Sequence, residues 1–205
     1  MKRGTGFTLI ELLVVFSIIT VLTGVVFSSQ SSFNKTLVLT NTAYDIALTL
    51  RSAETYGLSS RAAGAAASVG YGIHLSSGVR NSFILFADTS GGISCAGMTP
   101  DCKSGDHVYS AGGDAPPVQT YVIGNGITIS NFCVRTSAGS SCVPDVSSLD
   151  IVFVRPNPNP LISANGSYSA ANTGACLTIA SPQGGTRSIS IAASGQIIAN
   201  ATSCP

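Results

Sequence analysis

The side chains that could carry chemistry in this 205-residue chain are two histidines, six cysteines and nine acids. Neither histidine has a motif partner, and the chain has no Gly-x-Ser-x-Gly, no His-Glu-x-x-His and no phosphate-binding glycine loop. We expect His74 to lie on a sheet face and His107, in a polar loop, to be exposed to solvent. The sequence therefore predicts no enzyme, no cofactor and no metal site.

The cysteines all lie in the second half of the chain. They are Cys95, Cys102, Cys133, Cys142, Cys176 and Cys204. Their spacing does not match that of zinc ligands, so disulfides are the better interpretation and free thiols the alternative. The economical pairs join 95 to 102, 133 to 142 and 176 to 204, although other pairings remain open. Disulfides form in oxidising compartments, which places this region outside the cytoplasm.

Four aspartates cluster around one predicted loop, namely Asp88, Asp101, Asp106 and Asp114. Carboxylates so close together could bind calcium, which prefers several oxygen ligands. Their spacing fits no EF-hand, and aspartate is common in turns because its side chain accepts backbone hydrogen bonds. We therefore expect turn-forming acids.

The first residues, Met-Lys-Arg-Gly-Thr-Gly6, precede a 21-residue apolar run from Phe7 to Phe27 whose only charge is Glu11. As a helix the run would be about 30 Å long, enough to cross a bilayer. Lys2 and Arg3 stand before it with no matching basic cluster just after it, so the N-terminus should stay in the cytoplasm and the rest be exported. The predicted topology is a single span.

Glu11 needs a partner, because a carboxylate in mid-membrane costs about 2.5 to 3.5 kcal/mol. If the chain is cut after Gly6, the new ammonium group of Phe7 lies one helical turn from Glu11, near the positive end of the helix. The acid would then be neutralised within one chain or by a neighbouring chain's amine.

Gly6 followed by Phe7-Thr-Leu-Ile-Glu11-Leu closely resembles the class III leader and first helix of type IV pilins and type II secretion pseudopilins. The resemblance implies that a prepilin peptidase cuts between Gly6 and Phe7 and that Phe7 is methylated. It also implies that Glu11 guides filament assembly. The alternative is an ordinary secretory signal peptide cut near residues 26–28, which leaves Glu11 unexplained and has an unusually long apolar stretch.

A second helical stretch follows the apolar run. Apolar residues recur at steps of three and four, as in one stripe of an amphipathic helix, at Leu39, Ala43, Ile46, Leu50 and Ala53. No proline interrupts residues 7–61, so one long helix is expected, with Gly57 or Gly64 as its stop signal.

Beyond residue 62 short apolar alternations separated by Gly, Ser, Asn and Pro predict strands. We expect them near 68–75, 81–88, 118–122, 127–134, 150–155, 176–180, 186–192 and 196–199. The proline-rich stretch 155–160 should not be an inner strand. The fold class is α+β, with a long N-terminal helix, transmembrane in its first half and amphipathic in its second, packed on an antiparallel β-rich head. The expected boundaries are 1–6 for the leader, 7–27 for the membrane helix, 28–61 for the amphipathic helix and 62–205 for the head.

Three segments sharpen the resemblance toward minor pilins and pseudopilins of the GspH/FimT type. They are Tyr44 to Glu54, the strand pair Tyr71 to Leu75 with Phe83 to Asp88, and Arg187 to Ile197. This implies a structural subunit in the inner membrane and then in a filament, with other pilins, a prepilin peptidase and an assembly platform as partners. Whether the machine is a pilus or a secretion system stays open, as do a major pilin and a plain single-span or secreted binding protein.

A DNA-binding minor pilin of an uptake pilus is a further alternative. Charged residues make up only 9% of the chain, and the formal net charge is +1. Residues 188–205 contain no Lys or Arg, and Ser194-Gly195-Gln196 stands where a DNA-binding member would be expected to carry arginine. The scattered Arg135, Arg155 and Arg187 are typical of a solvated surface. The sequence therefore argues against DNA as a partner.

Overall fold

The structure is a computed structural model. It describes residues 6–59, 61, 63, 69–90, 105–114, 117–139, 142–143 and 146–204, with the backbone alone at 28–34. The chain divides into two compact units, Met1–Val38 and Leu39–Pro205.

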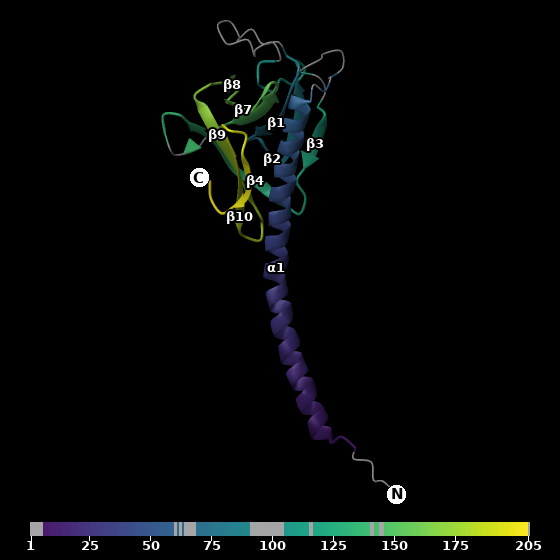
Figure 1. The fold of residues 1–205 in the computed structure, drawn as a ribbon. Coiled ribbons are helices and arrows are strands. Elements are labelled where there is room, and N and C mark those ends of the chain that lie inside the picture. Colours follow the sequence, from purple (N-terminus) through teal and green to yellow (C-terminus); the bar gives the residue numbers. More distant parts are fainter. Residues whose placement is uncertain are drawn as a thin grey trace. The chain divides into compact units, whose positions relative to one another are not determined.

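A single helix, α1, runs from Leu9 to Leu58 (Figure 1). Its first part, Leu9–Phe27, is the one helical stretch within the described residues that is long and apolar enough to cross a membrane. Every side chain in that stretch is exposed. Three hydroxyls there donate to backbone carbonyls of the preceding turn, from Ser17, Thr20 and Thr23, at 2.7–2.8 Å. Such bonds leave no hydroxyl without a partner in an apolar surrounding.

The predicted amphipathic stripe is confirmed in the Leu39–Pro205 unit. All five of its residues, Leu39, Ala43, Ile46, Leu50 and Ala53, are buried. Among the largest fully buried side chains of the unit, Ile46 and Leu50 come from α1 and the others from strands or their flanks. The end of the helix is therefore part of the core of the head, and the strands lie against it (Figure 1).

Gly57 has a different role from the one we expected. The helix passes through Gly57 and ends at Leu58. A Cβ atom at Gly57 would collide with the backbone carbonyl oxygen of Phe153. The glycine thus allows close contact between helix and sheet, and Gly64 lies outside the described residues.

The head contains two antiparallel sheets, which confirms the α+β class. The six-stranded sheet has the order β3-β2-β1-β6-β7-β8. Its strands are β1 (Gly70–Ser76), β2 (Val79–Asp88), β3 (Gln119–Val122), β6 (Ser148–Val154), β7 (Asn157–Ala164) and β8 (Ser167–Tyr168). The five-stranded sheet has the order β11-β10-β9-β4-β5. Its strands are β4 (Thr128–Thr136), β5 (Cys142–Val143), β9 (Asn172–Ala180), β10 (Thr186–Ala192) and β11 (Ile197–Ala201).

The two faces of the six-stranded sheet have different coverings. One face packs on α1, where the ring of Tyr71 contacts the ring of Tyr56, with the ring centroids 5.6 Å apart. On the opposite face, which we call the outer face, Phe86, Val152 and Val154 form a buried cluster that Tyr109 covers. Because successive side chains of a strand alternate between faces, one strand can contribute side chains both to the contact with α1 and to the cluster on the outer face.

Strand β7 is the main element that the sequence pattern missed. It starts within the stretch 155–160 and pairs with β6 from Asn157 to Ala164, with an irregular register in between. Its other side pairs with β8 only at Ser163 and Ala164. Pro158 and Pro160 therefore lie where the strand is paired on one side, a position that tolerates a missing N–H donor.

Replacement of Gly57 by alanine tests the helix–sheet contact. We expect Gly57→Ala to lower the free energy of unfolding of the head by about 2 kcal/mol, because overpacking against a backbone oxygen outweighs the better helix propensity of alanine. Denaturant unfolding of the full chain in detergent measures this. The matched control is Gly24→Ala in the same helix, where a Cβ meets nothing within 4 Å. Equal unfolding of the two variants would refute the contact.

Candidate processing and assembly site

Thr8 and Glu11 form a capping box at the start of α1. The backbone N–H of Thr8 donates to Glu11 Oε2 at 3.1 Å, and its hydroxyl donates to the same oxygen at 3.0 Å. In return the backbone N–H of Glu11 donates to Thr8 Oγ1 at 3.3 Å. This reciprocal pattern satisfies donors that the first helical turn would otherwise leave unpaired.

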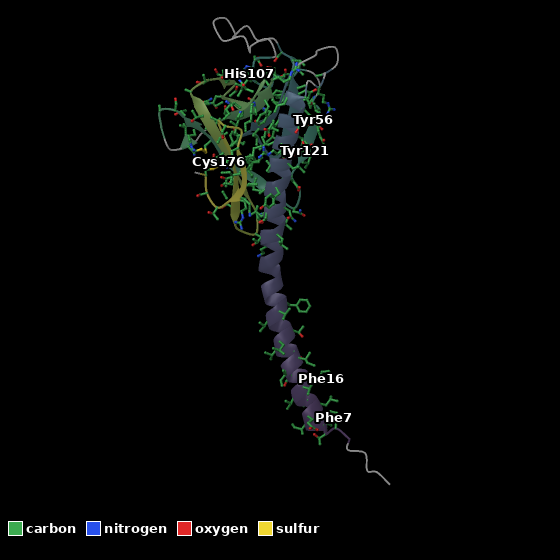
Figure 2. The ribbon with its side chains drawn as sticks, viewed as in Figure 1. Phe7, Phe16, Tyr56, His107, Tyr121 and Cys176 are labelled. Carbon is green, nitrogen blue, oxygen red and sulfur yellow. A yellow bond between two sulfur atoms is a disulfide. The ribbon has the colours of Figure 1, made fainter. Side chains whose placement is uncertain are left out.

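The capping box fixes where the helix begins. Because Thr8 is the cap, the helix starts at Leu9, and Gly6 and Phe7 stay outside it in a non-helical conformation. Phe7 is labelled near the start of the helix in Figure 2. It is 84% exposed, and the neighbouring Gly6 is exposed as well. The Gly6–Phe7 peptide bond therefore lies in an accessible stretch of chain next to a rigid helix, which is a geometry that a peptidase can bind.

Glu11 has a partner in the uncut chain that our reading of the sequence did not foresee. We expected the acid to wait for the ammonium group of a cleaved Phe7, whereas the structure gives its carboxylate two donors from Thr8. The pattern Thr8-x-x-Glu11 just before an apolar run is the sequence signature of a capping box and could have revealed it. An acid near the helix N-terminus is also favoured by the helix dipole.

Residues 1–27 match the family model of the prokaryotic N-terminal methylation motif. The match supports a prepilin signal of the type IV pilin kind, and with it general processing by a prepilin peptidase and assembly with other pilin subunits. The apolar helix Leu9–Phe27, which lies within the matched residues, is consistent with membrane anchoring before assembly. Comparison with the curated proteins and with the solved structures gave no match.

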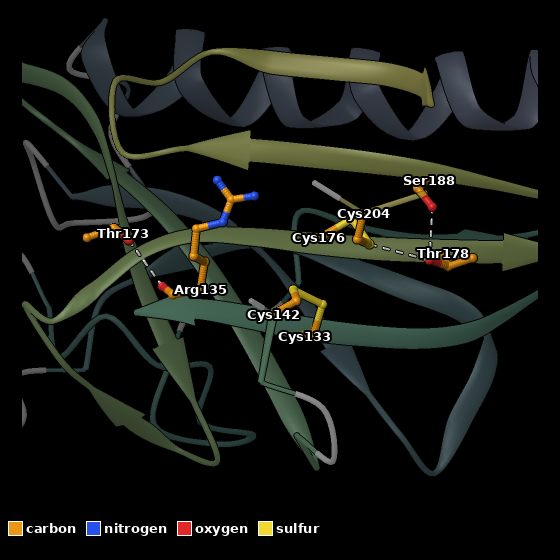
Figure 3. Close-up of a disulfide and its surroundings, with 8 residues drawn as sticks. All are labelled: Cys133, Arg135, Cys142, Thr173, Cys176, Thr178, Ser188 and Cys204. Atoms are coloured by element: carbon orange, nitrogen blue, oxygen red, sulfur yellow. Dashed lines mark hydrogen bonds between the residues drawn. A yellow bond between two sulfur atoms is a disulfide. The ribbon is translucent and has the colours of Figure 1, made fainter. Parts of the chain in front are cut away.

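Two disulfides lie on neighbouring strands of the five-stranded sheet (Figure 3). One joins Cys133 of β4 to Cys142 of β5, with Cα atoms 5.5 Å apart. The other joins Cys176 of β9 to Cys204 near the C-terminus, with Cα atoms 5.8 Å apart. These are two of the three pairs that the spacing favoured, and Cys95 and Cys102 lie outside the described residues.

The prediction for His107 was wrong. Its side chain is buried, with 3% of the residue exposed, and its ring packs on Tyr168. The backbone N–H of His107 donates to the buried carboxylate of Asp88 at 2.9 Å, which holds the loop against the sheet. The polar sequence of the loop indicated exposure, whereas contacts with Asp88, Ser163 and Tyr168 bury the residue. His74, on β1, lies with Nδ1 2.6 Å from Asp150 Oδ1.

The loop aspartates accept backbone hydrogen bonds, as expected of turn-forming acids. Asp114 accepts from the N–H groups of Thr89, Ser90 and Ser110 at 2.7–2.9 Å. Asp106 accepts from the N–H of Val108 at 3.1 Å. Within the part of the chain that the structure describes, no three His, Cys, Asp or Glu side chains are placed to bind a metal. Asp101 lies outside that part.

The scattered arginines, Arg135, Arg155 and Arg187, do not lie on one surface that could bind DNA. Arg135 stands opposite Gly174, which stands opposite Ala192, so all three lie on one face of the five-stranded sheet. Arg187 is five positions before Ala192 on β10, and an odd step places it on the other face. Arg155 is in the turn between β6 and β7 of the other sheet. These three arginines therefore do not form one basic stripe for a duplex.

Removal of the Thr8 hydroxyl tests the capping box. We expect Thr8→Ala to cost about 1 kcal/mol at the helix start, so that the amide of Glu11 exchanges with solvent about fivefold faster. Amide hydrogen exchange of the full chain in detergent micelles measures this. Thr8→Ser, which keeps the hydroxyl, should exchange as the parent does. The same rate in all three proteins would show that the cap contributes nothing.

Proposed function

We propose that the protein is a structural minor pilin or pseudopilin subunit, made as a precursor and assembled through its N-terminal helix into a type IV pilus or a type II secretion pseudopilus. The observation that carries the proposal is one local arrangement. An accessible Gly6–Phe7 bond immediately precedes an apolar helix whose single acid, Glu11, is already held by hydrogen bonds.

Cleavage is the first step of the proposed mechanism. A prepilin peptidase would cut after Gly6, with residues 1–6 as the leader, and would methylate the new N-terminus at Phe7. The capping box lies entirely on the mature side of the cut, because both of its residues follow Phe7. The helix start therefore survives processing, and the new ammonium group is added one turn before Glu11.

Retention in the inner membrane is the second step. The span 7–27 would hold the chain there with the head, residues 62–205, outside the cytoplasm, and residues 28–61 would join the two. The hydrogen-bonded hydroxyls of Ser17, Thr20 and Thr23 lower the cost of placing this helix in hydrocarbon. The two disulfides suit an oxidising compartment.

Entry into the filament is the third step. There the apolar helix packs among the helices of other subunits, supported by an inner-membrane assembly platform. The ammonium group of Phe7, in the same or a neighbouring subunit, then pairs with the Glu11 carboxylate. Thr8 keeps that carboxylate hydrogen-bonded until the stronger charged partner arrives. The head supplies contacts to other subunits, and its segments that resemble the GspH/FimT type support a minor role.

The mass of the mature N-terminus tests the processing step. After co-expression with a prepilin peptidase, we expect a chain that begins at Phe7 and carries one added methyl group. A peptidase-free host provides the control, in which the chain should retain residues 1–6. A mature chain that begins near Ser29 would instead identify a conventional secretory signal.

Replacement of Glu11 tests the assembly step. We expect Glu11→Ala to be cut normally but to enter filaments about tenfold less. Without the Glu11 carboxylate, the ammonium group of Phe7 has no opposite charge to pair with in the apolar interior of the filament. Immunoblots of sheared filaments and of membranes measure the ratio. The matched control is Glu54→Ala, which removes an acid that pairs with Arg51 on the same helix. Filament entry of the Glu11 variant at the parent level would contradict the mechanism.

A further inference from the structure

The segment Gly105–Asp114, which we call the strap, crosses the outer face of the six-stranded sheet. The ring of Tyr109 packs on Phe86 at 5.2 Å and on His74 at 4.8 Å. The hydroxyl of Ser163 on β7 donates to the carbonyl oxygen of His107 at 2.6 Å. The strap therefore covers the cluster of apolar side chains on this face.

Carboxylates provide most of the polar contacts between the strap and the sheet. Asp88, the last residue of β2, accepts from the backbone N–H groups of Asp106 at 3.2 Å and His107 at 2.9 Å. Asp150 of β6 accepts from the N–H of Tyr109 at 3.3 Å. Both acids are fully buried. The strap thus forms hydrogen bonds with two acids that are fully buried beneath it.

The fit at Asp88 is tight. Gly105 has a φ of 129°, and a Cβ atom there would overlap the Asp88 carboxyl group. His107 Nδ1 lies 3.4 Å from Asp88 Oδ2. Within the described residues this buried nitrogen has no hydrogen-bond partner, and neither has Asp150 Oδ2. A proton on Asp88 Oδ2 would give His107 Nδ1 a donor and would remove a buried charge.

We propose that Gly105–Asp114 is a pH-dependent strap, which binds the outer face of the sheet more tightly when the buried carboxyl group of Asp88 takes up a proton. The inference does not depend on the pilin proposal, because it concerns contacts within the head alone.

The surroundings of Asp88 also favour its protonated form while the strap is bound. Burial raises the pKa of Asp88 to about 6, the backbone N–H and the nearby ring of His107 lower it by less, and the negative charge of Asp114 adds to the rise. Burial also raises the pKa of Asp150, against the lowering effect of His74. Asp106, Tyr109 and Tyr168 are the further titratable residues that the described contacts place around the two acids and their histidines. A proton on either histidine would favour the ionised acids and act in the opposite direction.

Proton linkage gives the direction in which pH changes the binding of the strap. With the strap released, Asp88 faces water and returns to its ordinary pKa of 3.8, so the docked state binds more protons between about pH 4 and pH 6. Docking therefore strengthens as the pH falls through this window. From a pKa of about 6 in the docked state, we expect a gain of about tenfold between pH 7 and pH 5.

Amide hydrogen exchange of the full chain in detergent micelles tests the proposal. After correction for the intrinsic pH dependence of exchange, protection of the Asp106, His107 and Tyr109 amides should rise about tenfold from pH 7 to pH 5. Asp88→Asn, which cannot titrate at this position, should remove most of the rise and leave only the contribution of Asp150. Asp45→Asn, on an exposed position of α1, should retain it. A flat or falling profile in the parent, or an unchanged rise in Asp88→Asn, would overturn the proposal.

A direct titration keeps the proposal falsifiable if Asp88→Asn does not fold. The carboxyl carbon of Asp88 in the parent chain can be followed by NMR across the same pH range. A midpoint near pH 6 together with the rise in amide protection supports the strap. A midpoint near the ordinary value of about 4 rejects it, whatever the variant does.

Discussion

A polar group taken out of water needs a partner within the chain, and this constraint governs the helix from Leu9 to Leu58. Backbone groups inside the helix pair with one another. Its hydroxyls bond to carbonyls of the turn before, and its one early acid is held by Thr8. The same helix can thus expose a predominantly apolar first part and contribute a buried stripe to the head. Each polar side chain in that first part has a hydrogen-bond partner.

The head meets the same constraint with buried carboxylates. Asp88 and Asp150 have no exposed surface, yet each accepts a backbone N–H from a loop that is distant in the sequence. Gly57 allows α1 to lie close to the backbone of Phe153, and Gly105 allows the strap to lie close to Asp88. The contacts with α1 and the acids that hold the strap are therefore on opposite faces of the six-stranded sheet, and each face also has buried apolar side chains.

Periodic patterns in the sequence predicted the parts of this fold that repeat. The apolar run, the stripe from Leu39 to Ala53 and most strands follow from spacing alone, because burial of one face imposes a period. The burial of His107 could not be predicted in this way, since it depends on Asp88 on the separate strand β2. Strand β7 forms a hairpin with its neighbour β6, but the prolines at its start hide the alternating pattern of a strand. The Thr8–Glu11 box is a local signal that was available in the sequence. Gly57 matched the pattern of a helix stop signal, but a glycine is needed there because the backbone of Phe153 leaves no room for a Cβ atom.

The disulfide between Cys176 and Cys204 has a mechanical consequence. Strands β10 and β11 both lie between its two cysteines, and Cys176 is on β9, the middle strand of its sheet. A head pulled along its chain cannot extend this closed loop, which hides a contour length on the order of 90 Å. Under load, the edge strand β11 stays tethered to the centre of the sheet even after its own hydrogen bonds break. It can then pair again as soon as the tension falls.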